Sequence, residues 1–259
     1  MAFALFLCVN IIGGIVMGLT GIAYLFSGKD TDVVGEMQEY AIEGEISSLS
    51  VNLSGAELKI KTSDYFSVKS NHEYISVSSD DGKLIINETK KPFVAHPKGV
   101  TVIIYIPEGF VFDEASIDTG AGEVGISALA ADVLHLSLGA GEVTIDSLTA
   151  NTRADINGGA GEMTVKGGKL CNLKLDMGVG ELTMKSRIEG ESNIDMGVGE
   201  MNLTLLGNKD DYCIKADKGI GEISVDGEDM SDGSVWGSGD NVIDVDGGIG
   251  QIKIKILAD

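Results

Sequence analysis

The sequence predicts an all-β fold: a parallel β-solenoid (β-helix) with rungs of about 19–20 residues, preceded by one N-terminal transmembrane helix. Three observations lead to this prediction. A Gly-x-Gly-Glu motif recurs along the chain, apolar and polar residues alternate on both sides of each copy, and the N-terminal run carries no charged side chain. We therefore expect a transmembrane anchor at 1–28, a linker at 29–44 and a solenoid domain at 45–259.

The N-terminal run from Ala2 to Ser27 is long enough to cross a bilayer, because a spanning helix needs about 20 residues. It lacks the basic start and the short apolar region of a cleaved signal peptide, which favours an uncleaved, single-pass anchor in the cell membrane. The flank that follows is net acidic, so no basic cluster holds the C-terminal side in the cytoplasm. We expect the large domain to be extracytoplasmic. Gly14 and Gly18 form a GxxxG pair, which either supports a homodimer of anchors or arises by chance in a glycine-rich span.

The repeat is the strongest signal in the sequence. Its full copies run from TGAGEVGI at 119–126 to GGIGQIKI at 247–254, and an incomplete early copy, LSGAELKI, occupies 53–60. Successive motif glutamates are 19, 20, 19, 19 and 22 residues apart, and the final step to Gln251 is 29 residues. The glutamate positions are Glu123, Glu142, Glu162, Glu181, Glu200 and Glu222.

The residues around each motif follow the two-residue period of a β-strand. In the copy around Glu162, for example, Ile156, Met163 and Val165 are apolar and alternate with polar or small residues. Each repeat therefore predicts two short strands joined at the Gly-x-Gly corner, where glycine permits a positive φ or a close approach between rungs. One such unit cannot bury its apolar face alone, so stacked repeats should share a continuous core.

The region before the first full copy is less regular, but it still predicts strands. Asp80-Asp81-Gly82 is typical of a hairpin turn. The segment 90–99 contains Pro92 and Pro97 and is expected to be a loop. The expected strands are Leu49–Leu53, Tyr74–Val77, Leu84–Asn87 and Val100–Ile106.

The last copy is predicted to cap the stack. Three isoleucines in it alternate with Lys253 and Lys255, and lysine on an exposed edge strand discourages pairing with another chain. The preceding segment, 226–241, is expected to be a loop that carries Trp236. This tryptophan is either a contact residue for a binding partner or a side chain that packs the loop onto the solenoid.

The formal net charge of -21 argues against nucleic acid as a partner, because phosphate binding needs clustered Lys and Arg. Such an acidic surface either prevents self-association or attracts a basic partner. Cys171 and Cys213 lie two repeats apart, about 9–10 Å when rungs stack, which is too far for a disulfide. We expect free, mostly buried thiols at both positions, and Cys8 lies in the apolar N-terminal run.

Stacking should align the motif glutamates in one column and Asp118, Asp176, Asp195 and Asp217 in a second. Three explanations for these carboxylates stay open. They are solvated or bound by backbone N–H groups at the corners, they bind calcium, or they bind an envelope protein or a cationic peptide. The calcium ligands would be Glu123, Glu142, Glu162, Glu181, Glu200, Glu222, Asp176 and Asp195.

We expect no catalytic residues and no cofactor other than that calcium. The stretch GAGEVG at 120–125 matches the GxGxxG pattern, but no helix can follow it before the next strand, as a dinucleotide site requires. His72, His96 and His135 are scattered, without a metal-binding spacing, and no GxSxG motif is present. A polysaccharide-active enzyme with paired carboxylates is the less favoured alternative.

The early strands, the IYIPEGF segment at 104–110 and the Gly-x-Gly-Glu rungs together resemble the bacterial putative-adhesin family of β-strand-repeat domains of unknown function. That family is related to domains in Lia-type envelope-stress proteins. The resemblance covers roughly 45–256 and implies a solenoid in the bacterial cell envelope, without agreed catalytic residues. We therefore expect a non-catalytic binding or sensing module. The alternative is a structural or adhesive surface rod.

Overall fold

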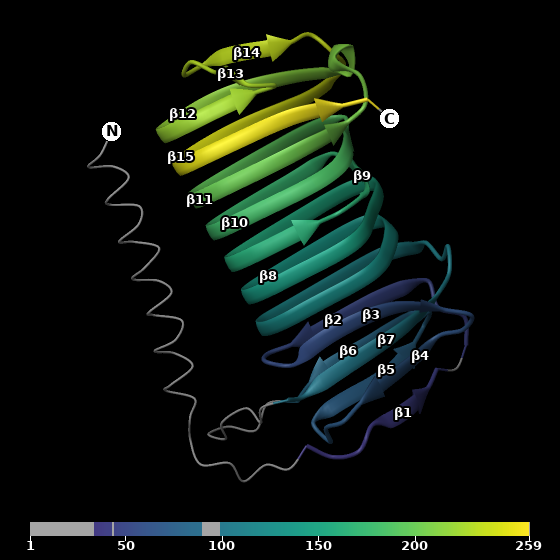
Figure 1. Ribbon diagram of the computed structural model, residues 1–259. Coiled ribbons are helices and arrows are strands. Elements are labelled where there is room, and N and C mark those ends of the chain that lie inside the picture. Colours follow the sequence, from purple (N-terminus) through teal and green to yellow (C-terminus); the bar gives the residue numbers. More distant parts are fainter. Residues whose placement is uncertain (1–33, 43, 90–98, 259) are drawn as a thin grey trace, which may run out of the picture.

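The computed structural model describes residues 34–42, 44–89 and 99–258, which form one stack of β-strands (Figure 1). Among these residues, no helix has the length and apolarity of a membrane span. The expected transmembrane helix and the Gly14/Gly18 pair lie outside the described residues.

In the described ranges, fifteen strands join a single sheet, and one short 3-10 turn, η1 (Lys209–Asp211), interrupts them. The strands are β1 (Gln38–Ala41), β2 (Ser48–Leu53), β3 (Glu57–Ser63), β4 (Ser67–Ser70), β5 (Ile75–Asp80), β6 (Lys83–Glu88), β7 (Thr101–Pro107), β8 (Phe112–Val165), β9 (Gly168–Cys171), β10 (Leu173–Glu189), β11 (Glu191–Leu206), β12 (Tyr212–Val225), β13 (Glu228–Asp229), β14 (Ser234–Gly237) and β15 (Asn241–Leu257).

The repeats stack in parallel and in register, as the sequence predicts. Glu181 of β10 pairs with Glu162 of β8 on one side and with Glu200 of β11 on the other. Each long strand runs to a corner, bends there and returns, and the corners align along one edge of the stack (Figure 1). An all-β, open sheet with mostly parallel strands confirms a solenoid-like fold.

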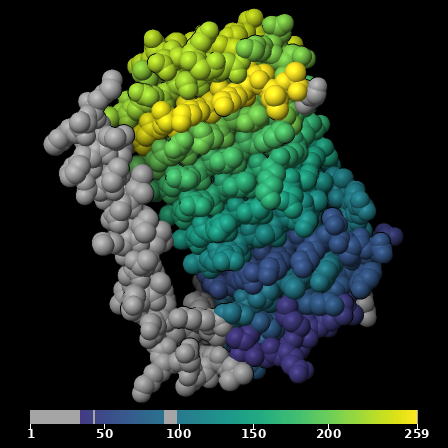
Figure 2. All heavy atoms as spheres, viewed as in Figure 1, coloured from purple at the N-terminus to yellow at the C-terminus, as the bar shows by residue number. Residues whose placement is uncertain are grey.

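The core consists of columns of apolar side chains, one from each rung. Ile156, Leu175 and Ile194 form one such column, and each is at most 1% exposed. Burying a side chain of this kind contributes about 1.5–3 kcal/mol. A rung on its own would have no apolar neighbour above or below it. Its stability therefore depends on the adjacent rungs that cover its apolar side chains. In the space-filling view the rungs form closely packed parallel bands (Figure 2).

The incomplete early copy is a full rung. β2 pairs with β8 through Leu53 and Thr119, and β3 pairs with β8 through Leu58 and Val124. The layer before it is divided between β6, which pairs with β2, and β7, which pairs with β3. Its two halves are separated by 89–100, so the tight glycine corner begins only with the β2–β3 rung.

The predicted early elements are confirmed. β5 and β6 form an antiparallel hairpin whose turn residues, Asp81 and Gly82, have φ values of 46° and 75°. All four predicted strands are present, as β2, β5, β6 and β7. β1 and β4 extend the sheet in antiparallel fashion beyond β7. β1 lies within 29–44, the segment expected as a linker.

The prediction that the last copy caps the stack is wrong. β15 lies inside the stack, in parallel register with β11 on one side and β12 on the other, through Leu203, Ile254 and Val225. The reason is that 226–240 is long enough to step over β12 and return the chain to an open position between β11 and β12. Lys253 is therefore not on an edge strand; its Nζ lies 3.3 Å from Oε1 of Glu200.

The segment 226–241 is also more ordered than predicted. It contains β13 and β14, which pair antiparallel with β12 and cover its outer edge. Trp236 of β14 pairs with Ile214 and packs, partly buried, against the core. β12 with these two short strands is thus the end of the described stack.

Asp226 fastens the inserted strand. It follows β12 with a φ of 49°, its N–H donates to Ile254 O at 2.8 Å, and its Oδ1 accepts from Ile256 N at 3.0 Å. Its other carboxylate oxygen lies 2.6 Å from Lys209 Nζ. Burial acts to raise the pKa of Asp226, but the contacts with Lys209 and Ile256 outweigh it and lower that pKa.

Candidate functional site

Glycine makes the corner edge possible. Gly180 has a φ of 142°, and a Cβ built on it overlaps the carbonyl oxygen of Gly161 in the rung below. Gly199 and Gly250 repeat this geometry in the next two rungs. Only residues without a Cβ allow such a backbone approach, so the corners stack directly on one another.

The residue between the two glycines forms the tip of each corner, and every tip residue in the full copies is apolar. Strand pairing places Val179 beside Ala160 and Val198, and Ile249 beside Val198 and Ile220. These side chains are half-buried or exposed, and Ile220 is 69% exposed. We call this column the corner ridge; in spatial order it consists of Ala121, Ala140, Ala160, Val179, Val198, Ile249 and Ile220.

The motif glutamates form a column on one side of the corner ridge, as the sequence predicts. Pairing aligns Glu162, Glu181 and Glu200 in consecutive rungs. Gln251 then separates Glu200 from Glu222, because β15 lies between β11 and β12, and its Nε2 donates to Glu222 at 3.2 Å. An amide at this position interrupts the line of like charges.

The aspartates form the column on the other side of the ridge. The structure adds Asp246 of β15 to the predicted members, between Asp195 and Asp217. Asp176, Asp195 and Asp246 lie in consecutive rungs. The pKa of Asp195 is raised by partial burial and by the hydrogen bonds and charges of Asp176 and Asp246. The sequence does not show Asp246 as a neighbour of Asp195, since 51 residues separate them (246 − 195).

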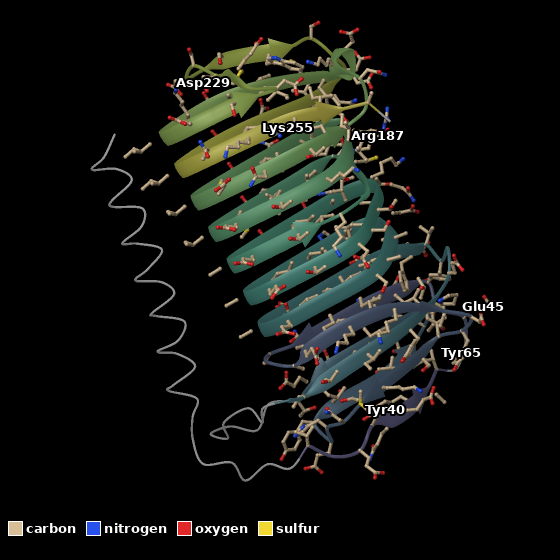
Figure 3. The ribbon with its side chains drawn as sticks, viewed as in Figure 1. Tyr40, Glu45, Tyr65, Arg187, Asp229 and Lys255 are labelled. Atoms are coloured by element: carbon tan, nitrogen blue, oxygen red, sulfur yellow. The ribbon has the colours of Figure 1, made fainter. Side chains whose placement is uncertain are left out.

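Few basic side chains neutralise these columns. Lys174 pairs with Asp176 at 3.2 Å and Lys253 with Glu200 at 3.3 Å. Within the described ranges, no Lys, Arg or His nitrogen lies within 4 Å of the carboxylates of the following motif glutamates: Glu123, Glu142, Glu162 and Glu181. Other basic residues lie elsewhere, as Arg187 does at the edge opposite the corners (Figure 3).

The corner N–H groups bind the neighbouring rung. The N–H of Ala121 donates to Ser54 O at 3.0 Å. At the β2–β3 corner, Glu88 of β6 accepts from the N–H groups of Ser54 at 2.6 Å and Gly55 at 3.1 Å. A carboxylate therefore binds corner N–H groups where the layer beneath lacks a glycine corner, and this residue is not one of the motif glutamates.

In the aspartate column, the carboxylate of Asp195 contacts those of Asp176 and Asp246 in the neighbouring rungs. In the part of the chain that the structure describes, no three Asp, Glu, His or Cys side chains are grouped as ligands for one metal ion. The calcium hypothesis for both columns stays a prediction that a direct test must decide.

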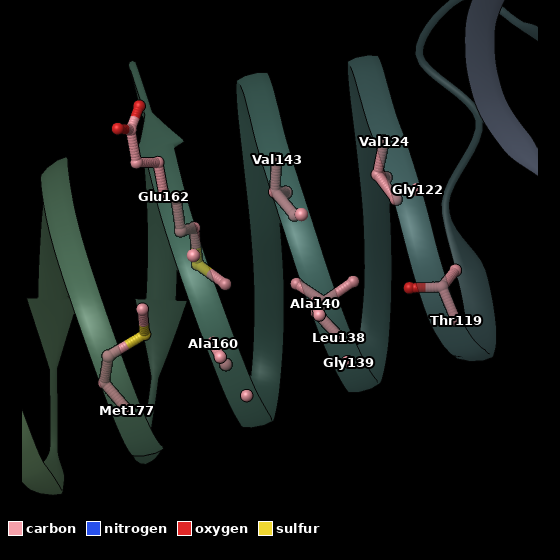
Figure 4. Close-up of a pocket in the computed structure, with 15 residues that line it drawn as sticks. Thr119, Gly122, Val124, Leu138, Gly139, Ala140, Val143, Ala160, Glu162 and Met177 are labelled. Atoms are coloured by element: carbon pink, nitrogen blue, oxygen red, sulfur yellow. The ribbon is translucent and has the colours of Figure 1, made fainter. Parts of the chain in front are cut away.

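The cavity at the corner edge is much smaller than a typical pocket for a small ligand. The cavity behind the corners around Gly158 has a volume of about 20 Å³, enough for one water molecule. Leu138, Ala140 and Met177 line it from neighbouring rungs (Figure 4). Pockets for small molecules are typically about 300–1,000 Å³. The edge therefore offers a long surface rather than an enclosed site.

Two further sequence predictions are settled by the structure. Cys171 and Cys213 are free thiols, the first buried and the second partly buried. The GAGEVG stretch at 120–125 lies inside β8, at a corner followed by strand, so it does not have the strand–helix context of a dinucleotide site.

Several solved structures of bacterial proteins are similar to this chain. The chain is similar to a "putative cell adhesion protein" from Clostridium sporogenes ATCC 15579, with 18% identity, a TM-score of 0.39, and coverage of 86% of this chain and 99% of that one. It is similar to a "putative adhesin" from Bacteroides fragilis NCTC 9343, with 14% identity, a TM-score of 0.43, and coverage of 86% and 96%. A "putative lipid binding protein" from Parabacteroides distasonis ATCC 8503 matches with 14% identity, a TM-score of 0.29, and coverage of 86% and 93%.

A search of curated proteins finds no match. The Toastrack DUF4097 family matches residues 46–246, which include the rungs and the corner edge described above. The chain belongs to the Toastrack DUF4097 family.

Proposed function

We propose that this protein is a non-catalytic, membrane-anchored, extracytoplasmic module of the bacterial cell envelope, and that it binds or senses a basic partner through its corner edge. The uncharged run from Ala2 to Ser27 supports the anchor. The flank after it carries no cluster of basic residues that would hold the domain in the cytoplasm, which supports an extracytoplasmic domain.

The observation that carries the proposal is the pair of carboxylate columns, most of whose glutamates have no basic neighbour among the described residues. Like charges about 5 Å apart repel by roughly 0.8 kcal/mol even in water. The fold does not need acids here, because Gln251 occupies the same position in an intact rung. The repulsion between neighbouring carboxylates recurs from rung to rung, although folding does not require acids at these positions. Binding of a cationic partner would explain why the carboxylates are present.

The same geometry supports a non-catalytic role. Catalysis needs convergent groups in a pocket, whereas the corner carboxylates lie in lines along an open edge of the stack. The cavity behind the corners around Gly158 has room for about one water molecule, which is too little for a substrate. A long, open, acidic edge is suited to binding a macromolecule or peptide through many weak contacts.

The test compares two variants that lose the same charge. The corner-acid variant is Glu123→Gln/Glu162→Gln/Glu181→Gln. The far-edge variant is Glu114→Gln/Glu191→Gln/Asp210→Asn, which changes exposed acids near the ends of the strands opposite the corners. Binding of an octalysine peptide is measured by fluorescence anisotropy at low and at physiological salt.

We expect the corner-acid variant to bind the peptide about tenfold more weakly, since three exposed ion pairs of roughly 0.5 kcal/mol each are lost. The far-edge variant should bind almost as well as the unmodified chain. An equal loss in both variants would mean that the peptide responds only to net charge, and the corner edge would not be a binding site.

A further inference from the structure

The corner ridge is a partly exposed apolar line between the two carboxylate columns. At Val198, for example, Asp195 precedes the tip by three residues and Glu200 follows it by two. The backbone places these carboxylates on the two strands that leave the corner, so acids flank the tip on both sides. The tip itself contributes little to the core, yet Val and Ile are present there in four consecutive rungs. Exposed apolar surface rimmed by polar groups is typical of interaction sites.

We propose that the corner ridge binds an amphipathic, cationic α-helix whose apolar stripe lies along the ridge and whose Lys and Arg side chains, on both sides of that stripe, meet the two carboxylate columns. This proposal rests on the proposed function and specifies the chemistry of the partner. Laying the apolar face of a helix on an apolar surface is a common mode of peptide recognition.

The dimensions of helix and ridge agree. Seven rungs spaced by about 4.8 Å give a ridge of roughly 29 Å. An α-helix of this length has about 19 residues, and its turns repeat every 5.4 Å. The mismatch of about 0.6 Å per turn accumulates to about 3 Å over five turns. If the middle turn faces the middle rung, the end turns are displaced by only about 1.5 Å, which is less than half of the rung spacing.

Charge favours a cationic helix over two other possible partners of the ridge, an anionic membrane surface and the apolar N-terminal segment of this chain. An anionic membrane surface is disfavoured, because it would bring the acids on both sides of the ridge close to negatively charged lipid headgroups. The apolar segment of this chain, Ala2 to Ser27, has no charged side chain to pair with either column. A helix with basic residues beside its apolar stripe satisfies the ridge and both columns at once.

The ridge variant Val179→Thr/Val198→Thr/Ile249→Thr removes apolar surface but keeps β-branched side chains, which strands favour. Its matched control, Val111→Thr/Val235→Thr, changes valines that are 46% and 58% exposed and lie away from the ridge. The full chain is held in zwitterionic nanodiscs. Two labelled peptides of leucine and lysine, each about 19 residues long, are compared: an amphipathic helix and a scrambled isomer. Empty nanodiscs supply the lipid background.

We expect the unmodified chain to bind the amphipathic probe at least tenfold more tightly than the scrambled isomer. The ridge variant should lose most of this preference, and the control should keep it. Circular dichroism verifies that both variants are folded. Because every variant is held in the same lipid, differences between variants report on the protein surface.

Three results would overturn the proposal. In the first, both peptides bind equally well, the ridge variant binds as the unmodified chain does, and the corner-acid variant binds neither peptide. The edge would then bind basic partners without recognising an apolar stripe, and only the proposed function would stand. If the probe binds only after 1–33 are removed, the ridge is occupied by the chain's own N-terminal segment. Binding no stronger than to empty nanodiscs would end both proposals.

Discussion

Replacing Gly180 by alanine tests whether the corners stack as directly as the structure indicates. Its φ of 142° is a conformation that L-residues rarely adopt, and its added Cβ would overlap Gly161 O and lie 2.9 Å from Gly161 C. The backbone strain costs about 1–3 kcal/mol, and forcing the rungs apart costs a further 1–3 kcal/mol or so. We expect Gly180→Ala to lower the free energy of unfolding by about 4 kcal/mol.

Two other glycines separate the causes. Gly178→Ala places a Cβ 2.5 Å from Gly159 O without a positive φ, so it should cost about 1–3 kcal/mol. Gly125→Ala meets nothing within 4 Å and should be neutral or slightly stabilising. Urea-induced unfolding of the full chain in mild detergent, followed by circular dichroism, gives the three values. Equal stability of Gly180→Ala and Gly125→Ala would refute direct stacking of the corners.

Four further predictions follow from the fold and the columns. Ile254→Ala should lower the free energy of unfolding by about 2–5 kcal/mol, since this buried side chain belongs to an interior rung; a loss below 1 kcal/mol in urea unfolding would place β15 at an edge. The raised pKa of Asp195 means that folding favours its protonated form, so its stabilising effect is present at low pH and is lost as the pH rises through the raised value. Asp195→Asn should therefore be the more stable chain at pH 7 and equal to the unmodified chain below the pKa of an unfolded aspartate, as thermal unfolding across pH can verify. Calcium should leave the melting temperature unchanged relative to chelator, and a rise of several degrees would show that the carboxylates collect the ion. Protease added to intact cells should digest the domain, whereas complete protection until lysis would reject the extracytoplasmic assignment.

The repeat, the corner glycines and the glutamate column could be predicted because they depend on local spacing. Because the Gly-x-Gly-Glu motif recurs every 19–20 residues, Glu162, Glu181 and Glu200 become neighbours once consecutive rungs stack. The two-residue period around each motif likewise decides which side chains face the core. Both signals need only residues that are close in the sequence or one repeat apart.

The insertion of β15 could not be predicted from such signals. An intact rung pairs equally well at the end of a stack or inside it, so GGIGQIKI carries no mark of its position. The only indication is the step of 29 residues from Glu222 to Gln251, which leaves chain enough to pass over β12. The neighbours Asp195 and Asp246, and the fastening of β15 by Asp226, follow from that insertion and could not be seen beforehand.

The corner ridge was present in the sequence but is recognisable only with the fold. The residue between the two glycines changes from Ala to Val to Ile along the stack, and alternation alone does not tell whether it faces the core. The backbone at the corner turns it outward, as the 69% exposure of Ile220 demonstrates. Its position between two acidic columns is a property of stacked rungs.

The most direct test of the central claim, that the corner edge is the binding face, is carboxyl labelling with and without bound octalysine. A carbodiimide and an amine label accessible Asp and Glu side chains, and mass spectrometry reports each site. If the corner edge is the binding face, the peptide protects Glu162 and Glu181, while Glu114 and Glu191 stay as reactive as before. Protection of Glu114 and Glu191, with unchanged labelling at the corner, would contradict it.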